Sequence, residues 1–522
     1  MKDKYLIDRI STFSEDQIEK LFPCIVDHKK QGLEFPLDME VMTELKILSG
    51  KLRDTDDDYE LFRHRQIVDK LWTMLLEKAI KCLRFFDNRE PFLESKGTKF
   101  PKAYGIGALK RYYEQYSEFE HVLYGSNEYY RDHVVHVFRT WISGVDLLTQ
   151  NGGRFIETIS IQDKEGPPEL KKVEKLSMWT IIALTHDLGY PLEKAKSIID
   201  VTQKMVSTFV TNPDVSIDFA FHGVQNYMND FIVRLMSSKM VKQDGKYFAR
   251  LQPKYYFKFQ KSLERNSHGI LSTLIIYKLL TYFLESDYNI NEDYPFNEDD
   301  RRQFYIRREI LRSIASHTCD DVYQMYMGSF SFLLRICDDT QEWGRKYLSE
   351  LYVKPNTEYE LKKIDFTIAE REGECNRCSI EEQIKFGEQP DSNALIKLIS
   401  RFHKQALTYI MIFRDGQDTK NRDFSFLRTM RIEFQEEAIV LRLEIMTDRA
   451  SKMKGTIQYG TNDQRKRMLS SAFLESVESA LSSKVEDKVL FDKNDSQIAP
   501  DSDDVDNPSK WKALDFSVIL LG

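Results

Sequence analysis

The segment LSMWTIIALTHDLG, residues 176–189, is the most informative stretch of this sequence. Apolar residues occupy almost every side of it, which predicts a buried helix rather than an amphipathic surface helix. His186 and Asp187 stand at the end of this helix, where we expect Gly189 to stop it. A carboxylate at the end of a buried helix is costly unless it is paired or bound to a metal ion. The simpler interpretation is a hydrogen-bonded His–Asp pair that closes the helix.

A second helix is predicted to begin at Ser126 or Asn127, either of which could cap it. Its apolar stripe repeats at steps of three and four and consists of Val134, Phe138, Trp141, Val145 and Leu148. His133 and His136 lie off this stripe, about 60° apart around the helix. Small residues on their side, such as Gly144, would leave room for a pocket. By themselves the two histidines would be interpreted as surface or hydrogen-bonded side chains.

Further polar groups also stand beside apolar helices. The apolar run from Phe330 leads directly into Asp338 and Asp339, and only one of two adjacent helical residues can point straight inward. We expect Asp338 to face inward and Asp339 to face outward or to support its neighbour. His268 opens one apolar segment, and His317 ends another. Alone, these residues would be interpreted as solvated carboxylates and as capping or core histidines.

The joint pattern is more specific than its parts, because imidazoles and carboxylates alternate along the chain at the ends of apolar helices. The candidate metal ligands are His136, His186, Asp187, His268, His317 and Asp338. Such donors suit zinc, iron or manganese, and helices that face a bundle core are a known way to present them. A structural zinc site has four ligands and normally uses cysteine. A larger set without cysteine therefore favours a catalytic site with open positions.

In this order, residues 127–345 resemble the HD-domain metal-dependent phosphohydrolase superfamily. The stretch ALTHDLGYP, residues 183–191, is similar to the family's central histidine–aspartate doublet. The resemblance implies that the doublet, His136 and Asp338 bind metal. It also implies that His268 and His317 correspond to the extra histidines of two-metal members, in which the doublet aspartate bridges both ions.

The sequence departs from the family pattern near the doublet. Where family members often have a lysine, this chain has Tyr190. The Gly-Tyr-Pro triplet there resembles the cyclic-di-nucleotide phosphodiesterase branch, but that branch has it well downstream, so its substrate is not carried over. The cyclic-nucleotide phosphodiesterases place an acid histidine four residues before the ligand histidine, whereas His133 precedes His136 by three. His133 and Asp339 are the two candidates for catalytic proton transfer.

Residues 239–265 form a basic segment inside an acidic chain. It contains eight lysines and arginines against two acidic residues, with tyrosines and phenylalanines interleaved. Cations bind phosphates and aromatic faces stack on bases, so the segment favours a nucleotide substrate. The candidate substrate-binding residues are Lys254, Lys258, Lys261 and Arg265. The alternative is a solvated insertion with a partly buried aromatic face.

Composition limits the class of protein. The chain has 522 residues and a net charge of −8, which disfavours a basic nucleic-acid coat protein. It lacks a run of about 18 apolar residues, so no membrane partner is expected. Its six cysteines are scattered and its first residues are polar, so we expect a cytoplasmic, reducing location.

The expected fold is mainly α, with an HD-type helical bundle over residues 126–355 and further helices over residues 1–125. Alternating apolar patterns then predict an α+β domain over residues 356–522. Its expected strands are 359–367, 424–434 and 438–446, its expected helices are 393–413 and 465–483, and residues 493–510 are expected to form a loop. The lone Cys-X-X-Cys at Cys375 and Cys378 is also interpreted as a loop.

The leading functional prediction is hydrolysis of a nucleotide or related phosphoester or phosphoanhydride. One or two divalent ions (manganese, iron, zinc or magnesium) would lower the pKa of a bound water to about 7 and so supply hydroxide. Two alternatives stay open: a diiron oxygenase of the same superfamily, and a regulatory or binding protein with a structural metal site. A nucleic-acid partner and self-association are also compatible with the sequence.

Overall fold

The computed structural model of the chain has two compact units, which are described separately. We call residues 3–322 and 328–353 the helical unit, and residues 354–522 the C-terminal unit. The structure describes residues 3–23, 25, 34–53, 60–83, 105–126, 132–161, 163, 166–211, 224–284, 294–319, 328–340, 359–371, 374–386, 398, 402, 424–434, 437–447, 453–461, 490–492 and 511–518. Within these residues the fold is mainly helical.

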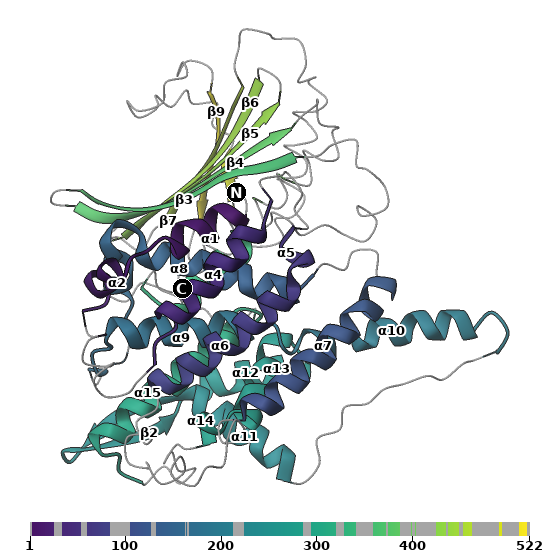
Figure 1. The fold of residues 1–522 in the computed structure, drawn as a ribbon, viewed down its shortest axis with the longest axis vertical. Coiled ribbons are helices and arrows are strands. Elements are labelled where there is room, and N and C mark those ends of the chain that lie inside the picture. The colour runs from purple at the N-terminus through teal and green to yellow at the C-terminus, as the bar shows by residue number, and fades with distance from the viewer. Residues whose placement is uncertain are drawn as a thin grey trace. The chain divides into compact units, whose positions relative to one another are not determined.

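The helical unit is built around a buried central helix, α9 (Figure 1). Its helices are α1 (Asp3–Ser11), α2 (Glu15–Leu21), α4 (Met39–Lys51), α5 (Glu60–Arg63), α6 (Arg65–Leu83), α7 (Ile106–Ser126), α8 (Val134–Thr158), α9 (Lys172–Thr185), α10 (Tyr190–Val206), α11 (Val224–Ser237), α12 (Pro253–Glu264), α13 (His268–Leu279), α14 (Thr281–Leu284), α15 (Glu298–Ser316) and α16 (Phe330–Thr340). Helix α9 packs against α6, α8 and α15. Its residues from Lys175 to Thr185 are all buried, which confirms the predicted buried helix.

The predicted start of the second helix is wrong. Ser126 ends α7, and α8 begins only at Val134. Acceptors stand ready at this start, because Asp132 accepts from the N–H of Val135 in the first turn (3.1 Å) and Glu120 accepts from that of the N-cap residue His133 (2.7 Å). Gly144 does not leave room for a pocket either. A Cβ at this position would lie 2.1 Å from the Trp179 ring, so the glycine lets α8 and α9 approach closely.

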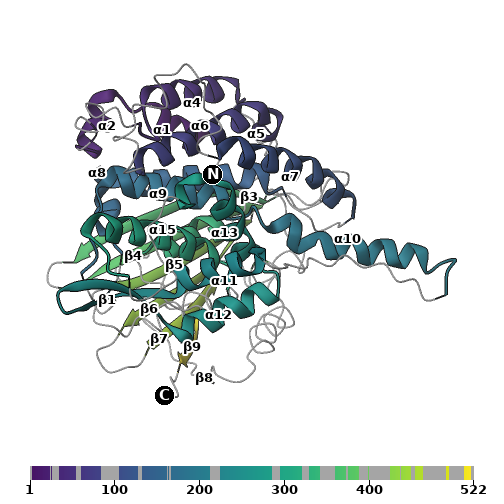
Figure 2. The same ribbon diagram turned by 90° about the horizontal axis from the view of Figure 1, so that it is seen from below.

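The turn after α9 also differs from the prediction. Helix α9 ends at Thr185, and Gly189 is the N-cap residue of α10 rather than the stop of α9. Its φ of −80° is accessible to any residue. Glycine is required for a different reason, since a Cβ here would lie 2.3 Å from the carbonyl oxygen of His268. From this turn α10 extends away from the other helices of its unit, as two views show (Figures 1 and 2).

The basic segment forms a hairpin followed by a helix. Strands β1 (Ser238–Gln243) and β2 (Lys246–Leu251) pair in antiparallel register. Asp244 and Gly245 form their turn with positive φ values of 50° and 76°, the conformation that an Asp-Gly pair favours in a two-residue hairpin. Helix α12 follows and leads directly toward α13.

The described part of the C-terminal unit is a mixed sheet. Its strands are β3 (Tyr359–Arg371), β4 (Glu374–Phe386), β5 (Phe424–Phe434), β6 (Glu437–Thr447), β7 (Met453–Thr461), β8 (Leu490–Asp492) and β9 (Trp511–Val518). The strand order is β3-β4-β5-β6-β7-β9-β8, and β4–β5 is the parallel pair. The three predicted strands are confirmed as β3, β5 and β6. Cys375 and Cys378 lie in β4, so their interpretation as a loop is wrong: the segment pairs with strands on both sides.

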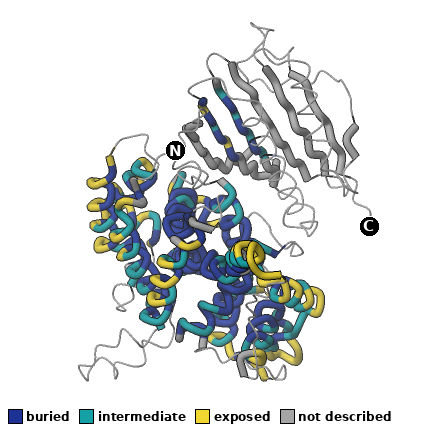
Figure 3. Tube along the Cα trace, turned by 90° about the vertical axis from the view of Figure 1, so that its right-hand side faces the viewer, coloured by how far each residue is buried: buried dark blue, intermediate teal, exposed yellow. Residues whose placement is uncertain are grey.

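The two helices and the loop predicted in this unit lie outside the described residues, apart from Leu398 and Phe402, which are helical and buried. In the helical unit, buried residues run through the interior of the bundle (Figure 3). Among the residues that the structure describes, no helix combines the length and the apolar content that a membrane crossing requires.

Candidate metal centre

The six predicted metal ligands come together inside the helical unit. His136 lies in α8, His186 is the C-cap residue of α9 with Asp187 next to it, His268 opens α13, His317 is the C-cap residue of α15, and Asp338 lies in the last turn of α16. Five helix ends therefore supply polar groups to a single buried place.

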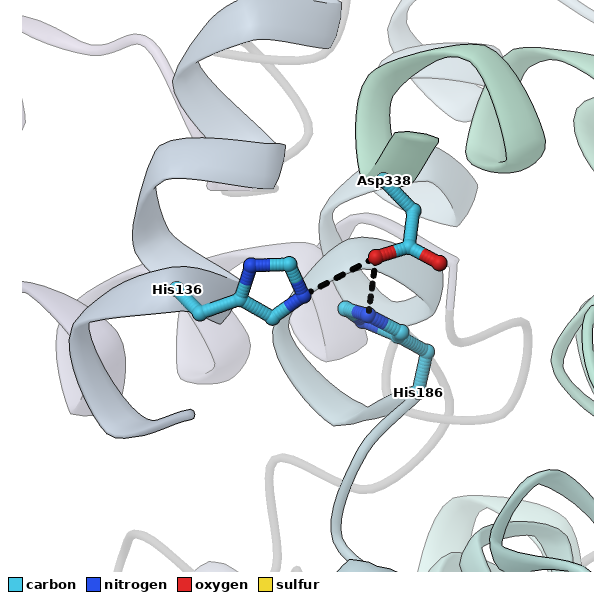
Figure 4. Close-up of side chains that lie close together, drawn as sticks. All are labelled: His136, His186 and Asp338. Atoms are coloured by element: carbon cyan, nitrogen blue, oxygen red, sulfur yellow. Dashed lines mark ion pairs between the residues drawn. The ribbon is translucent and has the colours of Figure 1, made fainter. Parts of the chain in front are cut away.

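One side of the cluster joins His136, His186 and Asp338, whose side chains point toward one another (Figure 4). Asp338 Oδ1 lies 3.0 Å from His136 Nε2 and 4.0 Å from His186 Nε2. Asp187 Oδ2 faces the same two nitrogens, at 3.4 Å from His136 and 3.5 Å from His186. We call these four residues the first half-site.

The other side of the cluster uses the second oxygen of the same carboxylate. Asp187 Oδ1 lies 3.4 Å from Nε2 of His268 and 3.4 Å from Nε2 of His317. We call these three residues the second half-site. The Asp187 carboxylate thus stands between two pairs of imidazoles, with one oxygen toward each pair.

Hydrogen bonds from the opposite ring nitrogen orient three of the imidazoles. His186 Nδ1 contacts the carbonyl oxygen of Ala183 at 2.8 Å, and His317 Nδ1 contacts that of Ile314. His268 Nδ1 lies 2.6 Å from Glu193 Oε2. In each case the bond turns Nε2 toward the aspartates, which is the orientation that histidine ligands of metals usually have.

Close backbone packing fixes the two half-sites relative to each other. Ser272 Oγ lies 2.6 Å from the carbonyl oxygen of His186 and 2.8 Å from that of His268, and it accepts the N–H of Gly189 at 2.8 Å. A Cβ on Gly269 would lie 2.8 Å from the carbonyl oxygen of Ile314 and 3.0 Å from His317 Nδ1. Helix α13 can therefore approach α15 this closely only with glycine at position 269.

Electrostatics favour ionised carboxylates at the cluster. Burial alone would raise the pKa of Asp187, but the imidazoles around it, His186 first, hold that pKa well below its usual range. Burial likewise opposes ionisation of Asp338, whose pKa is lowered chiefly by His136. Burial and the neighbouring imidazoles lower the pKa of His317 despite the attraction of Asp187. Burial opposes the charge on His268, whose pKa is nevertheless raised by Glu193 and Asp187. The cluster is thus suited to two ionised carboxylates and a neutral His317, the forms in which these groups bind metal.

The residues fit a divalent ion. Nε2 of His186 and Nε2 of His317 are buried and form no hydrogen bond with any described residue, although both face Asp187. Such atoms are rare in protein interiors unless a bound group satisfies them. In a site with bonds of about 2.1 Å, neighbouring donors lie about 3.0 to 3.4 Å apart, close to the separations seen here. These groups could hold a metal ion.

The two candidates for proton transfer lie in different surroundings. His133 is buried beside the first half-site, with its ring 5.9 Å from that of His136 and stacked on Tyr190 at 3.7 Å between centroids. Asp339 forms an ion pair with Arg335 at 3.1 Å. The guanidinium of Arg335 thus occupies Oδ2 of Asp339, one of the two oxygens that would otherwise take up a proton.

The four candidate substrate-binding residues follow one stripe of α12 and its C-cap, at positions 254, 258, 261 and 265. Lys254, Lys261 and Arg265 are exposed and Lys258 is half-buried, so they lie outside the buried cluster. The last of them, Arg265, precedes His268 by three residues. Cys319, two residues after His317, donates from Sγ to the carbonyl oxygen of Lys258 at 3.8 Å. Helix α12 therefore runs beside the second half-site.

Sequence reasoning missed Glu193 and Ser272, which orient the candidate ligands. The available signal was weak: Glu193 lies one turn into the helix after the doublet, and Ser272 lies one turn after His268. Neither spacing shows that α10 and α13 meet.

Comparisons with protein-family models, with curated proteins and with solved structures found no match to this chain.

Proposed function

We propose that this chain is a metal-dependent phosphohydrolase that acts on a nucleotide or a related phosphoester or phosphoanhydride. The observation that carries the proposal is the position of Asp187, whose two carboxylate oxygens each face a different pair of imidazole nitrogens. A carboxylate shared in this way suits a pair of divalent ions. The helical surroundings and the order of the residues are those expected of an HD-type domain, to which we assign the part of the helical unit that follows residue 125.

His136, His186, Asp187 and Asp338 would hold one ion, and Asp187, His268 and His317 the other. A pair of divalent ions supplies a hydroxide at neutral pH and neutralises phosphoryl oxygens as negative charge develops on them. The protein's own contribution is geometric. Three of the imidazoles have Nδ1 fixed by a hydrogen bond, so the Nε2 lone pairs are oriented before any ion arrives.

Proton transfer belongs to His133 in this proposal rather than to Asp339. The imidazole of His133 lies at the edge of the first half-site and packs on Tyr190. Stacking on Tyr190 holds the imidazole in one orientation. A positioned imidazole of this kind can give a proton to the substrate oxygen or take one from it. Asp339 is held by Arg335 and supports the end of α16.

The substrate class follows from the charge and shape of α12. Its lysines and Arg265 form a cationic stripe beside the second half-site, and Phe257 on the same helix is 67% exposed. Cations bind phosphate oxygens, and an exposed aromatic ring offers a surface on which a base can stack. This combination favours a nucleotide over an uncharged ester.

The test is elemental analysis of the purified chain, followed by a screen of nucleotides and phosphodiesters with manganese, zinc, iron and magnesium. We expect about two ions per chain and turnover of at least one phosphate compound. Asp187→Ala should lose the ions and all turnover, whereas Asp339→Asn should retain the ions. A chain that binds no ion, or that consumes oxygen with bound iron and releases no phosphate, would contradict the proposal.

A further inference from the structure

His268 differs from the other oriented imidazoles in what holds it. The Nδ1 atoms of His186 and His317 contact carbonyl oxygens three residues earlier in their own helices. His268 is the first residue of α13, so no preceding turn of that helix can offer such a carbonyl. Its Nδ1 contacts a side chain from another helix instead, Glu193 of α10. The orientation of this imidazole therefore depends on a residue that can be substituted.

Glu193 makes two contacts to the same residue. Its Oε2 atom accepts the backbone N–H of His268 at 2.8 Å and contacts Nδ1 at 2.6 Å. The first bond caps the N-terminus of α13, and the second places the ring proton on Nδ1. The other oxygen, Oε1, pairs with Lys194 at 2.6 Å. With both oxygens engaged, the carboxylate cannot rotate without breaking one of these contacts.

The consequence for His268 is that Nε2 carries the lone pair and faces Asp187 Oδ1 at 3.4 Å. Tyr190, at the start of α10, packs edge-to-face on His268 with 5.3 Å between ring centroids and restricts the ring from a second side. Helix α10 thus supplies both the hydrogen-bond acceptor and the packing that fix this imidazole. By contrast, the four side chains of the first half-site come from α8, the end of α9 and α16, and none of them lies in α10.

We propose that Glu193 is the positioning residue of the second half-site: by fixing the tautomer and orientation of His268, it determines whether the chain holds its second ion. This inference rests on the proposed two-ion function and extends it to a residue that touches neither ion. Loss of the Glu193 carboxylate should weaken binding of one ion and spare the other, because the first half-site has its own imidazoles and carboxylates.

The experiment measures manganese binding by the full-length chain. We expect two ions in the wild-type chain, with the coupled electron paramagnetic resonance spectrum of two neighbouring manganese ions. Glu193→Leu should bind the second ion about 10- to 100-fold more weakly, which is the usual effect of removing a carboxylate partner from a ligating histidine. Its spectrum should become that of an isolated ion. Glu193→Gln keeps a neutral acceptor and should fall between the two.

A matched control is available in α9. Glu174 also accepts a backbone N–H at a helix N-terminus (that of Lys171, at 2.7 Å) and pairs with a cation, Arg302, but it contacts no imidazole in the described hydrogen bonds. Glu174→Leu should therefore keep both ions. If Glu193→Leu does not fold, the comparison of Glu193→Gln with wild type decides the question through the spectrum.

The outcomes separate the two proposals. A wild-type chain that takes up fewer than two ions overturns both the two-ion function and the role of Glu193. A wild-type chain with two ions, whose Glu193 variants also hold two ions with unchanged affinity and an unchanged spectrum, overturns the role of Glu193 alone. Loss of the second ion in Glu174→Leu as well would show that helix capping, rather than imidazole orientation, is responsible.

Discussion

At the scale of single residues, buried charges in this protein are stabilised by specific partners. Asp187 remains ionised because imidazoles surround it, and Arg308, which is fully buried, pairs with Asp163 at 2.9 Å. Lys78 is the clearest case outside the candidate metal centre. Its ammonium lies 2.6 Å from Asp38, 2.7 Å from Glu40 and 3.4 Å from Glu34, and so ties α6 to the start of α4.

Lys78→Met should lower the free energy of unfolding by about 1–3 kcal/mol at pH 7, because it leaves Asp38 and Glu40 without their cation, whereas Glu34 keeps Lys81. Burial opposes the charge on Lys78, but Asp38 and Glu40 raise its pKa above the usual value. Burial also opposes the charge on Glu34, whose pKa is nevertheless lowered by Lys81 and Lys78. The stabilisation is therefore complete between about pH 5 and pH 10.

Below about pH 5 the stabilisation by these ion pairs should decline as the pH falls through the lowered pKa of Glu34. Above about pH 10 it should decline as the pH rises through the raised pKa of Lys78. Urea denaturation at several pH values measures this. Lys70→Met is the control, since Lys70 also pairs α6 with α4, through Glu44, but is 57% exposed. It should change stability by less than about 0.5 kcal/mol. Equal effects of the two substitutions would contradict the argument.

At the scale of secondary-structure elements, glycine sets how closely α13 and α15 approach. Gly269→Ala would place a methyl group 2.8 Å from a backbone oxygen of α15. Since that oxygen cannot move independently, the helices must separate, at a cost of about 1–3 kcal/mol. The same shift would part His268 from His317. Chemical denaturation and manganese content should both show the loss.

Gly50→Ala provides the comparison for this prediction. Position 50 lies in the last turn of α4, and a Cβ there has nothing within 4 Å. This variant should be as stable as the wild type or more stable by up to about 1 kcal/mol, because alanine favours the helix. If Gly269→Ala behaves like Gly50→Ala, the close approach of the two helices has no energetic consequence.

The sequence predicted the elements better than their ends. Apolar content on all sides of residues 176–185 was enough to predict the burial of α9, and His268 and His317 do stand at helix ends. The start of α8 was misjudged because its capping acceptors include Glu120, which comes from the preceding helix. Strand β4 was missed because its Cys-Asn-Arg-Cys start lacks the alternation that marked the neighbouring strands.

The same limit applies to the candidate site. Periodicity and residue type were sufficient to select Asp187 and the five residues that gather around it, because each stands next to an apolar helix. They could not select Glu193, whose partner His268 is 75 residues away. Contacts between residues so distant in sequence depend on how whole helices pack, which no local pattern reports.

At the scale of the whole molecule, bound ions should stabilise the helical unit, because its candidate ligands come from α8, α9, α13, α15 and α16. An ion at 100 times its Kd contributes about 2.7 kcal/mol. Removal by a chelator should therefore lower the Tm by roughly 5 °C for a domain of this size. Differential scanning calorimetry with and without chelator, and again after manganese is restored, measures the change. Asp187→Ala should show no response to chelator, and a wild-type chain without a response would contradict metal binding.

The distance along the chain between His136 and Asp338 has a consequence for biosynthesis. These side chains lie 3.0 Å apart although 201 residues separate them. Contacts of such high sequence separation form late in folding, because long loops must close first. A ribosome must therefore release α16 before the first half-site can exist. A metal ion held at the first half-site would accordingly bind only after α16 has left the ribosome and packed against α8.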